Sequence, residues 1–227
     1  MARQISERNS ANEITVILAD DHKIVRQGLH AVLEANPDLR IVGEAGSGRE
    51  AVCLVERLQP AVLVLDLVLP ELNGLEVIRQ LTKRAPKTRV VVLSMHNDEC
   101  HVVQALKNGA AAYVLKDASA VHLVRAVRAA AANRRYLSPP LSDAAVNAYV
   151  QRGSDAMTDA YDSLTNRERE VFQLAAEGRT NAEIGKRLFI SPRTVEIHRA
   201  NMMTKLALRN QTELVRYAIK RGTLPFA

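Results

Sequence analysis

Polar residues that could carry phosphoryl chemistry follow the apolar runs in the first half of the chain. Each is the first polar residue, or pair of residues, after its run, and in chain order they are Asp20 and Asp21, Asp66, Ser94 and Lys116. The carboxyl ends of parallel strands meet at one edge of a sheet, where α/β proteins form their ligand sites. If the runs are neighbouring parallel strands, three carboxylates, one hydroxyl and one ammonium group converge there.

This set of groups suits the transfer of a phosphoryl group to an aspartate. Three clustered carboxylates repel one another, and a hard cation such as Mg²⁺ relieves that repulsion. A carboxylate oxygen held beside the cation can attack phosphorus and form an acyl phosphate. Ser94 could then hydrogen-bond one phosphoryl oxygen, and Lys116 could pair with another.

Three other interpretations of these motifs are weaker. A single Asp often only ends a strand or caps a helix, but four successive strand ends that turn polar argue against this. A phosphatase with an aspartate nucleophile would resemble DxDxT, whereas this chain reads Asp66-Leu67-Val68-Leu69. The glycine-rich stretch Gly43–Gly48 is neither GxGxxG nor followed by GK[ST], so it predicts a plain strand-to-helix turn.

Five apolar runs alternate with five amphipathic segments in this part of the chain. The runs are rich in β-branched residues, as in strands covered on both faces, and they span Ile14–Ala19, Arg40–Glu44, Ala61–Leu65, Arg89–Leu93 and Ala111–Leu115. The predicted helices span residues 23–35, 47–58, 74–84, 98–108 and 119–132. This alternation predicts a doubly wound α/β domain, a flavodoxin-like parallel sheet of five strands in the order 2-1-3-4-5.

The composition excludes several classes of protein. Hydrophobic residues make up 47% and charged residues 25%, an ordinary globular balance, and no apolar run approaches the roughly 20 residues that span a bilayer. Two cysteines without a CxxC pair and six histidines without HxxxH or HExxH argue against a disulfide framework and a zinc site. Residues 1–12 predict a disordered tail and lack the apolar core of a signal peptide, so we expect a cytoplasmic protein.

The α/β pattern stops near Asn133. The pair Pro139 and Pro140 and a polar stretch with Gly and Ser predict a linker over residues 137–162, in which Asp143–Arg152 could form a short helix. No strand-like run follows the linker. The predicted organisation is therefore a tail (1–12), an α/β domain (13–136), the linker (137–162) and a small all-α domain (163–227).

Start and stop signals divide the all-α domain into short helices. Thr165 and Glu168 predict a capping box, and a helix Ala182–Leu188 follows. Pro192 then begins a longer basic helix. A short helix, a turn and a longer basic helix form the helix-turn-helix arrangement, whose last helix suits the major groove of DNA. A net charge of +6 permits this, but an interaction bundle with a solvated basic face would have the same charge.

Residues 14–132 resemble the receiver domain of bacterial two-component response regulators, through the segments ILADDH, VLDLVLPELNG, VVLSMH and AAYVLKD. The resemblance implies that Asp66 is the phosphoacceptor. It also implies Mg²⁺ as the cofactor, and the residues that would hold the ion are Asp20, Asp21, Asp66 and, through its backbone carbonyl, Val68. The residues expected to bind the phosphoryl group and to respond to it are Ser94, Tyr113 and Lys116.

Residues 164–221 resemble the DNA-binding domain of the LuxR/NarL/FixJ regulators, through LTNREREV, EGRTNAEIGKRLFIS, PRTVEIHRANMMTKL and TELVRYA. The resemblance makes Ala182–Leu188 the scanning helix, Pro192–Leu206 the recognition helix and Gln211–Arg221 the dimerisation helix. The residues expected to contact DNA are Lys186, Arg193, Thr194, Glu196, Ile197, Arg199, Asn201 and Lys205. Glu196 and Ala200 depart from the more basic members, so no base preference is transferred.

Together the two resemblances imply a response regulator of the NarL/FixJ (LuxR-type) family, which is not an enzyme. A sensor histidine kinase would phosphorylate Asp66, and a homodimer would bind promoter DNA, with RNA polymerase as a further partner and no role for a membrane. Phosphorylation of Asp66 would act through the face Asp98–Ala132. It would favour the dimer and free the recognition helix. A phosphorylated adaptor without DNA and a regulator independent of phosphorylation stay open as alternatives.

Overall fold

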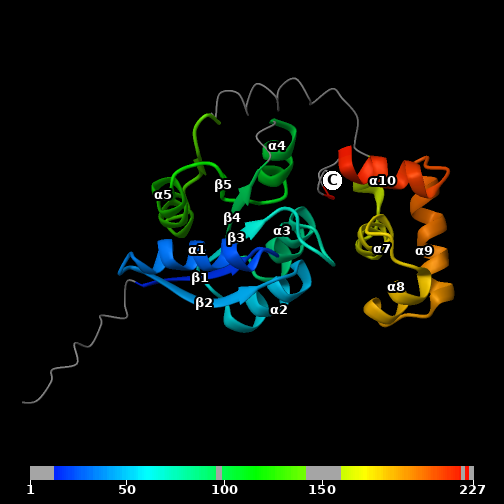
Figure 1. Cartoon of the computed structure of the whole chain (residues 1–227), viewed down its shortest axis with the longest axis horizontal. Helices are drawn as coiled ribbons and strands as arrows, with labels where there is room; N and C mark the ends of the chain where they lie inside the picture. The colour runs from blue at the N-terminus through cyan, green and yellow to red at the C-terminus, as the bar shows by residue number, and fades with distance from the viewer. Residues whose placement is uncertain (1–12, 96–98, 142–159, 221–222, 225–227) are drawn as a thin grey trace, which may run out of the picture.

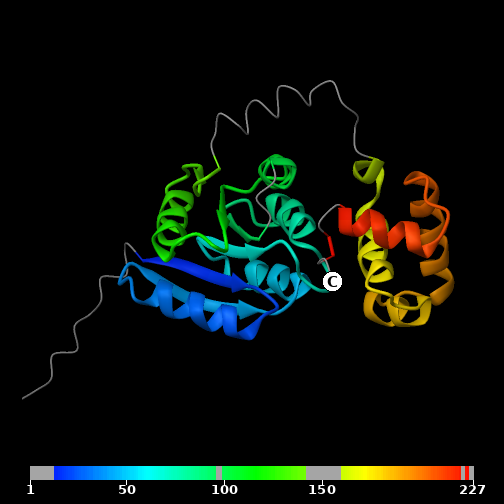
Figure 2. The same cartoon turned by 45° about the horizontal axis from the view of Figure 1, so that its top comes forward.

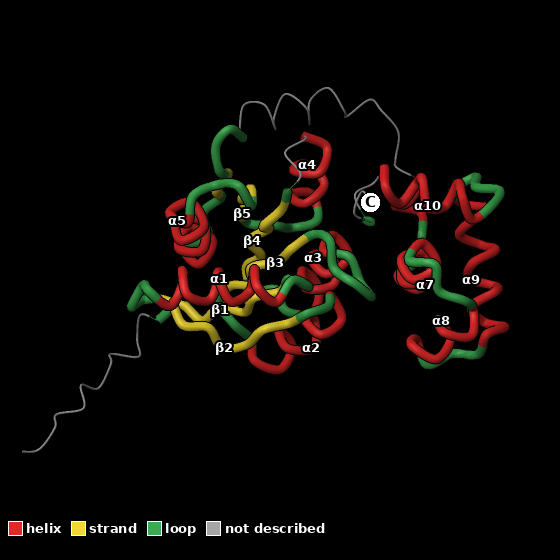
Figure 3. Tube along the Cα trace, in the orientation of Figure 1, coloured by secondary structure: helices red, strands yellow, loops and turns green. Residues whose placement is uncertain are grey.

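The computed structural model describes residues 13–95, 99–141, 160–220 and 223–224. In these ranges an α/β domain and a smaller helical domain lie side by side (Figure 1, Figure 2). Figure 3 separates helices from strands by colour and shows the strands gathered in the first domain. No helix in the described ranges is long and apolar enough to cross a membrane. The predicted tail, residues 1–12, lies outside them.

One parallel sheet forms the centre of the α/β domain, and its strand order is β2-β1-β3-β4-β5-β6. The order 2-1-3-4-5 is therefore confirmed, but the prediction of five strands is wrong by one. The strands are β1 (Ile14–Ala19), β2 (Leu39–Ala45), β3 (Val62–Asp66), β4 (Arg89–Ser94), β5 (Ala112–Leu115) and β6 (Tyr136–Leu137). Every residue of β3 and β5 is buried, as expected of strands covered on both faces.

Helices cover both faces of this sheet (Figure 1). One face is covered by α1 (Lys23–Glu34) and α5 (Ala120–Ala131), and the other by α2 (Gly48–Leu58), α3 (Gly74–Arg84) and α4 (Glu99–Lys107). Because successive strand side chains point to opposite faces, neighbouring residues divide between two cores. Val64 packs in the core beneath α1 and α5, while Leu63 and Leu65 pack in the core beneath α2, α3 and α4.

The sixth strand corrects the predicted start of the linker. Tyr136 and Leu137 pair with β5, and Ser138 is fully buried just beyond them. The Ser138 amide donates to the carbonyl of Tyr113 at 3.0 Å, and the Ser138 hydroxyl accepts from the Leu115 amide at 2.9 Å. A two-residue strand is too short to leave a periodic pattern, so the sequence indicated a loop from residue 137. The rest of the predicted linker, including Asp143–Arg152, lies largely outside the described residues.

The helical domain packs four α-helices around one apolar core. They are α7 (Asn166–Ala176), α8 (Asn181–Leu188), α9 (Pro192–Lys205) and α10 (Gln211–Lys220), preceded by a short 3-10 helix, η2 (Ala160–Ser163). The capping box of Thr165 and Glu168 is confirmed, and Thr180 with Glu183 forms a second one at α8. Each box satisfies amide groups that a helix start leaves without partners. The predicted helix-turn-helix is therefore α8, a short turn and α9.

Candidate phosphoacceptor site and DNA-binding surface

Asp66 ends strand β3 and lies at the centre of a charged cluster. Its side chain is 7% exposed, and its Oδ2 atom lies 2.6 Å from Nζ of Lys116, which follows the neighbouring end of β5. The same ammonium group lies 2.7 Å from Oδ2 of Asp20, at the end of β1. The topology thus brings three distant strand ends together, as the sequence predicted. Lys116 is placed to neutralise two carboxylates that would otherwise repel each other.

Burial and charge act in opposite directions on these groups. Burial raises the pKa of the Asp66 carboxyl above its ordinary value, and the charge of Lys116 offsets only part of that effect. Burial also lowers the pKa of Lys116, but the charges of Asp66 and Asp20 and their hydrogen bonds outweigh it, so that the pKa of Lys116 is raised. Lys116 therefore stays a cation at neutral pH and remains available to pair with an anionic phosphoryl group.

The acidic pair at the end of β1 divides into a buried and an accessible carboxylate. The Asp20 side chain is 1% exposed and accepts from the His22 amide at 2.8 Å, while the Asp21 side chain is 37% exposed. His22 lies within 2.7 Å of Asp21, from Nδ1 to Oδ1. Arg26 of α1 donates to the Asp20 carbonyl at 2.5 Å and so holds the end of the strand. His22 and Arg26 were not predicted to belong to this site, although both lie close to the acidic pair in the chain.

The oxygen-rich surroundings of Asp66 fit a hard cation. Asp20, Asp21 and Asp66 offer carboxylate oxygens and Val68 offers a backbone carbonyl, which are the ligand types that Mg²⁺ prefers. The partial exposure of Asp21 leaves space for the waters that Mg²⁺ keeps. One oxygen or nitrogen from each of Asp20, Asp21 and His22 lies within 4.8 Å of the others. The single charge of Lys116 offsets only one of the two carboxylate charges of Asp20 and Asp66, so the cluster keeps a negative charge that a cation would neutralise.

The remaining predicted residues of this site are buried beside it. Ser94 is 1% exposed at the end of β4, and Tyr113 is fully buried in β5. Leu115 lies opposite Ser94, and the Lys116 amide donates to the Ser94 carbonyl at 2.8 Å. Ser94 and Lys116 are thus fixed relative to each other by the sheet. Both predicted phosphate ligands stand at the same edge as Asp66.

The loop after Asp66 runs directly to the helical domain. Val68 donates its amide to Oδ1 of Asp66 at 3.2 Å, and three residues later Glu71 reaches α7 and α8. Arg187 of α8 lies 2.9 Å from the Glu71 carboxylate, and the Glu71 amide donates to the Glu177 carboxylate at 3.3 Å. Only four residues of chain separate Asp66 from Glu71, which makes this contact.

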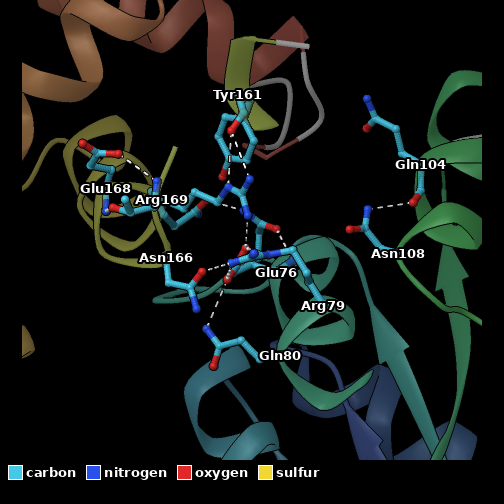
Figure 4. A network of polar contacts seen from close by, with 12 residues as sticks. Glu76, Arg79, Gln80, Gln104, Asn108, Tyr161, Asn166, Glu168 and Arg169 are labelled. Carbon is cyan, nitrogen blue, oxygen red and sulfur yellow. Dashed lines mark hydrogen bonds and ion pairs between the residues drawn. The ribbon is translucent and has the colours of Figure 1, made fainter. Parts of the chain in front are cut away.

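A second set of interdomain contacts joins α3 to α7 (Figure 4). Glu76 of α3 and Arg169 of α7 are 3% and 5% exposed, and their charged groups approach to 3.5 Å. Arg79 binds both Glu76, at 2.6 Å, and Asn166 of α7. Arg169 also donates to the Tyr161 carbonyl and lies over the Tyr161 ring, 5.2 Å from its centroid. The interface is polar and charged, and nothing in the sequence pattern of either domain had indicated it.

The predicted DNA-contacting residues divide into two groups. Exposed positions on α8 and α9 are Lys186, Arg193, Glu196, Ile197 and Asn201, with Thr194 half-buried. Arg199, which is half-buried, and Lys205, which is exposed, also make contacts within the domain. Arg199 donates to Asn181 at 3.1 Å and to Gln211, and Lys205 pairs with the buried Glu168 at 2.7 Å. The first group forms an accessible helix face, whereas these two residues also hold the helices together.

The face of α9 points away from the α/β domain. In Figure 1 and Figure 2, α9 lies on the far side of the helical domain, and the interdomain contacts described above come from α7 and α8. Ile197 is 51% exposed near the middle of this helix. An apolar side chain of this size on a recognition helix can contact thymine methyl groups in a major groove. The α9 face is thus accessible in the described arrangement.

Two family models match the chain. The model of the response regulator receiver domain matches residues 16–128, and that of the bacterial regulatory proteins of the luxR family matches residues 162–218. The first match covers the sheet from β1 to β5 with Asp66, and the second covers α7 to α9 and most of α10.

Relatives match this chain over 90% or more of its length. The oxygen regulatory protein NreC of Staphylococcus carnosus is 37% identical over 93% of this chain and 99% of its own. The transcriptional regulatory protein LiaR of Bacillus subtilis is 37% identical over 90% of this chain and 96% of its own. RcsB of Salmonella enterica serovar Typhimurium, solved on the promoter rprA with the phosphomimetic BeF3⁻, covers 91% of this chain and 98% of its own at 27% identity and a TM-score of 0.58. The chain therefore belongs to the NarL/FixJ family of two-component response regulators, which control transcription through a receiver domain and a LuxR-type DNA-binding domain.

Proposed function

We propose that this regulator is switched by phosphorylation of Asp66 and that the phosphorylated form binds specific promoter DNA. One observation carries the proposal. The Asp66 carboxylate ends a central strand with the Lys116 ammonium 2.6 Å away and Asp20 on the other side of that ammonium. This geometry supports the proposal, because a carboxylate can act as the nucleophile and an ammonium group beside it can pair with the phosphoryl oxygens.

In the proposed reaction, an Asp66 oxygen attacks the phosphorus of a phosphohistidine on a sensor kinase. The new O–P bond gives an acyl phosphate, and the N–P bond breaks to release the kinase imidazole. When bound, Mg²⁺ would supply charge neutralisation between the phosphoryl oxygens and the pocket carboxylates. Asp20, Asp21, Asp66 and the Val68 carbonyl would hold it. Lys116 would pair with one phosphoryl oxygen and Ser94 would donate to another.

The proposed response to phosphorylation starts from the side chains around that group. Ser94 and Tyr113 lie on β4 and β5, and β5 is flanked by α4, α5 and β6. Because β6 pairs with the free edge of β5, a receiver dimer through this face would use side chains of α4 and α5 rather than strand pairing. The added charge would bias this face between two states. The α10 helix would extend the dimer in the DNA-binding domain.

The proposed DNA contact uses the exposed face of α9 in a major groove, with Arg193, Thr194, Glu196, Ile197 and Asn201 toward the bases. Lys186 of α8 would reach phosphates. Arg199 and Lys205 would contribute mainly by fixing the helices. Because α9 already points away from the receiver, phosphorylation would act by pairing two chains on DNA rather than by uncovering this helix. We place the protein in the cytoplasm on this account, with RNA polymerase as a further partner.

Phosphorylation can be tested with acetyl phosphate and Mg²⁺. We expect intact-mass analysis to show the addition of one phosphoryl group to the parent and none to Asp66→Asn. Asp117→Asn, which removes an exposed carboxylate beside Lys116, serves as the matched control and should react like the parent. Phosphorylation of Asp66→Asn would overturn the assignment. Steady turnover of a small phosphoester would instead support a phosphatase.

A further inference from the structure

Arginines gather around two adjoining hollows at the edge of the receiver sheet opposite to Asp66. One hollow has a volume of about 320 Å³ and the other about 360 Å³, and Arg134 and Arg135 line both. Arg89 also lines the first hollow, and Arg125 and Arg128 line the second. Volumes near 300 Å³ are at the lower end of those of small-molecule sites.

The backbone around Arg134 and Arg135 is fixed at the end of α5. Asn133 adopts the left-handed conformation with φ of 57°, and its amide donates to the Ala130 carbonyl at 2.9 Å. The Arg134 amide donates to the Ala129 carbonyl at 2.8 Å. Beyond the two arginines, Tyr136 begins β6 and pairs with Ala112 of β5. The two guanidinium groups therefore extend from an anchored turn between a helix and a strand.

Most of the positive charge in this cluster has no anionic partner. Arg128 binds Asp38 at 2.7 Å through two nitrogens. For Arg89, Arg125, Arg134 and Arg135, the described part of the chain provides neither an ion pair within 4 Å nor a side-chain hydrogen bond, and no carboxylate lines either hollow. Like charges at this density destabilise one another unless an anion lies between them. The cluster is thus complementary to a ligand with several negative charges.

Small residues and one aromatic ring complete the lining of the two hollows. Gly109, Ala110 and Ala111 line the first hollow and leave space before the guanidinium groups. Ala129 and Tyr136 line the second, and the Tyr136 hydroxyl is held by Nδ1 of His122 at 2.5 Å. A guanidinium group binds phosphate through paired hydrogen bonds, and a tyrosine ring offers a surface on which a base can stack.

We propose that these hollows bind a nucleoside polyphosphate, with the phosphates between Arg89, Arg134 and Arg135 and the base against Tyr136. The site lies on the receiver domain, at the amino ends of β4 and β5, so it is separate from the phosphoacceptor pocket and from α9. A ligand there would contact the residues that precede β6. That strand is bonded to β5, which carries Tyr113. Ligand binding would thus act on β5, the same strand through which the proposed response to phosphorylation passes.

The test is calorimetric titration of the full-length, unphosphorylated protein with ATP and GTP, in EDTA so that Mg²⁺ does not mask the phosphates. We expect saturable binding to the parent and binding about 100-fold weaker to the double variant Arg134→Ala, Arg135→Ala, because two charge-assisted contacts are lost. The matched control is Lys83→Ala, Arg57→Ala, which removes two positive charges from α2 and α3. The control should bind like the parent.

Several results would overturn the proposal. These are absence of saturable binding at millimolar nucleotide, equal affinity of parent and double variant, or displacement of the nucleotide by duplex DNA of equal phosphate concentration. Equal affinity for inorganic triphosphate would remove the nucleoside from the assignment. If the double variant fails to fold, chemical-shift mapping on the parent can locate the nucleotide site instead. We expect nucleotide to shift the amides of Gly109 and Ala129, and shifts confined to the Asp66 pocket would contradict the site.

Discussion

The charged contact between the two domains gives a sharp prediction at Glu76. Glu76→Gln keeps the shape of the side chain but removes its charge, which leaves the guanidinium of Arg169 buried beside a neutral group. Removing one partner of a buried ion pair costs about 3–5 kcal/mol. Arg169 keeps its bonds to the Tyr161 carbonyl at 3.2 and 3.3 Å and its position over the ring. We therefore expect the docked arrangement to lose about 2.0–2.7 kcal/mol, or roughly 30- to 100-fold in the docking equilibrium.

Hydrogen exchange at one amide measures this equilibrium directly. The Glu71 amide donates to the Glu177 carboxylate across the interface at 3.3 Å, so its protection reports separation of the domains even when the docked form dominates. We expect this amide to exchange roughly 30- to 100-fold faster in Glu76→Gln. The control is Glu56→Gln, which removes the same charge from an exposed pair with Arg84 within the receiver. Such exposed ion pairs contribute little to stability, so the Glu71 amide of the control should exchange at the same rate as in the parent.

The reasoning would be refuted if Glu76→Gln folded normally and left the protection of the Glu71 amide unchanged. It would also be refuted if both variants increased the exchange equally, because the effect would then come from net charge. A double-mutant cycle with Arg169→Met completes the test. We expect the two changes together to cost less than their sum, since each variant alone strands a charge that the other removes.

Other predictions concern the packing and the caps around the two sites. Gly48→Ala should destabilise the receiver by about 1–3 kcal/mol in thermal unfolding, because the added Cβ would lie 1.8 Å from the Leu72 carbonyl oxygen. Gly28→Ala, with nothing within 4 Å of the new atom in α1, should instead stabilise it by up to about 1 kcal/mol, and equal effects would contradict the packing. In the helical domain, burial raises the pKa of Glu168, but hydrogen bonds from Lys205 and Thr165 outweigh it, so the pKa lies below the usual 4.5. The charged form therefore stabilises the fold above pH 4.5, and this contribution is lost as the pH falls through the lowered pKa. Glu168→Gln should be about 1 kcal/mol less stable at neutral pH and should approach the parent in acid, whereas a constant difference across the titration would argue against the cap. Lys186→Ala should weaken DNA binding and reduce the slope of affinity against salt by about one charge, while Arg57→Ala in the receiver should change neither.

The sequence was sufficient to predict the strands and helices that carry a regular pattern of apolar residues. The runs that become β1, β3 and β4 are almost continuously apolar and match the observed strands within one residue. The polar residue after each run lies where the predicted sheet order places it. The cap at Thr165 could be predicted because its partner, Glu168, lies three residues away in the chain. Local rules of this kind need no knowledge of the tertiary structure.

The parts that escaped prediction depend on contacts between distant segments. Strand β6 exists because Tyr136 and Leu137 find the free edge of β5, and a pair of residues carries no period. The bond from Lys205 to Glu168 joins residues 37 positions apart, and no local pattern in the sequence indicates it. The interface of Glu76 and Arg169 likewise joins two domains whose own sequence patterns are complete without it.

The most direct test of the account is selection of bound genomic DNA fragments by the full-length protein, with and without acetyl phosphate. It should be run in parallel on the parent, Asp66→Asn and Arg193→Ala. The account predicts that phosphorylation enriches a defined set of fragments for the parent only. Enrichment of the same fragments by Asp66→Asn, or equal enrichment by the parent with and without acetyl phosphate, would contradict a switch at Asp66.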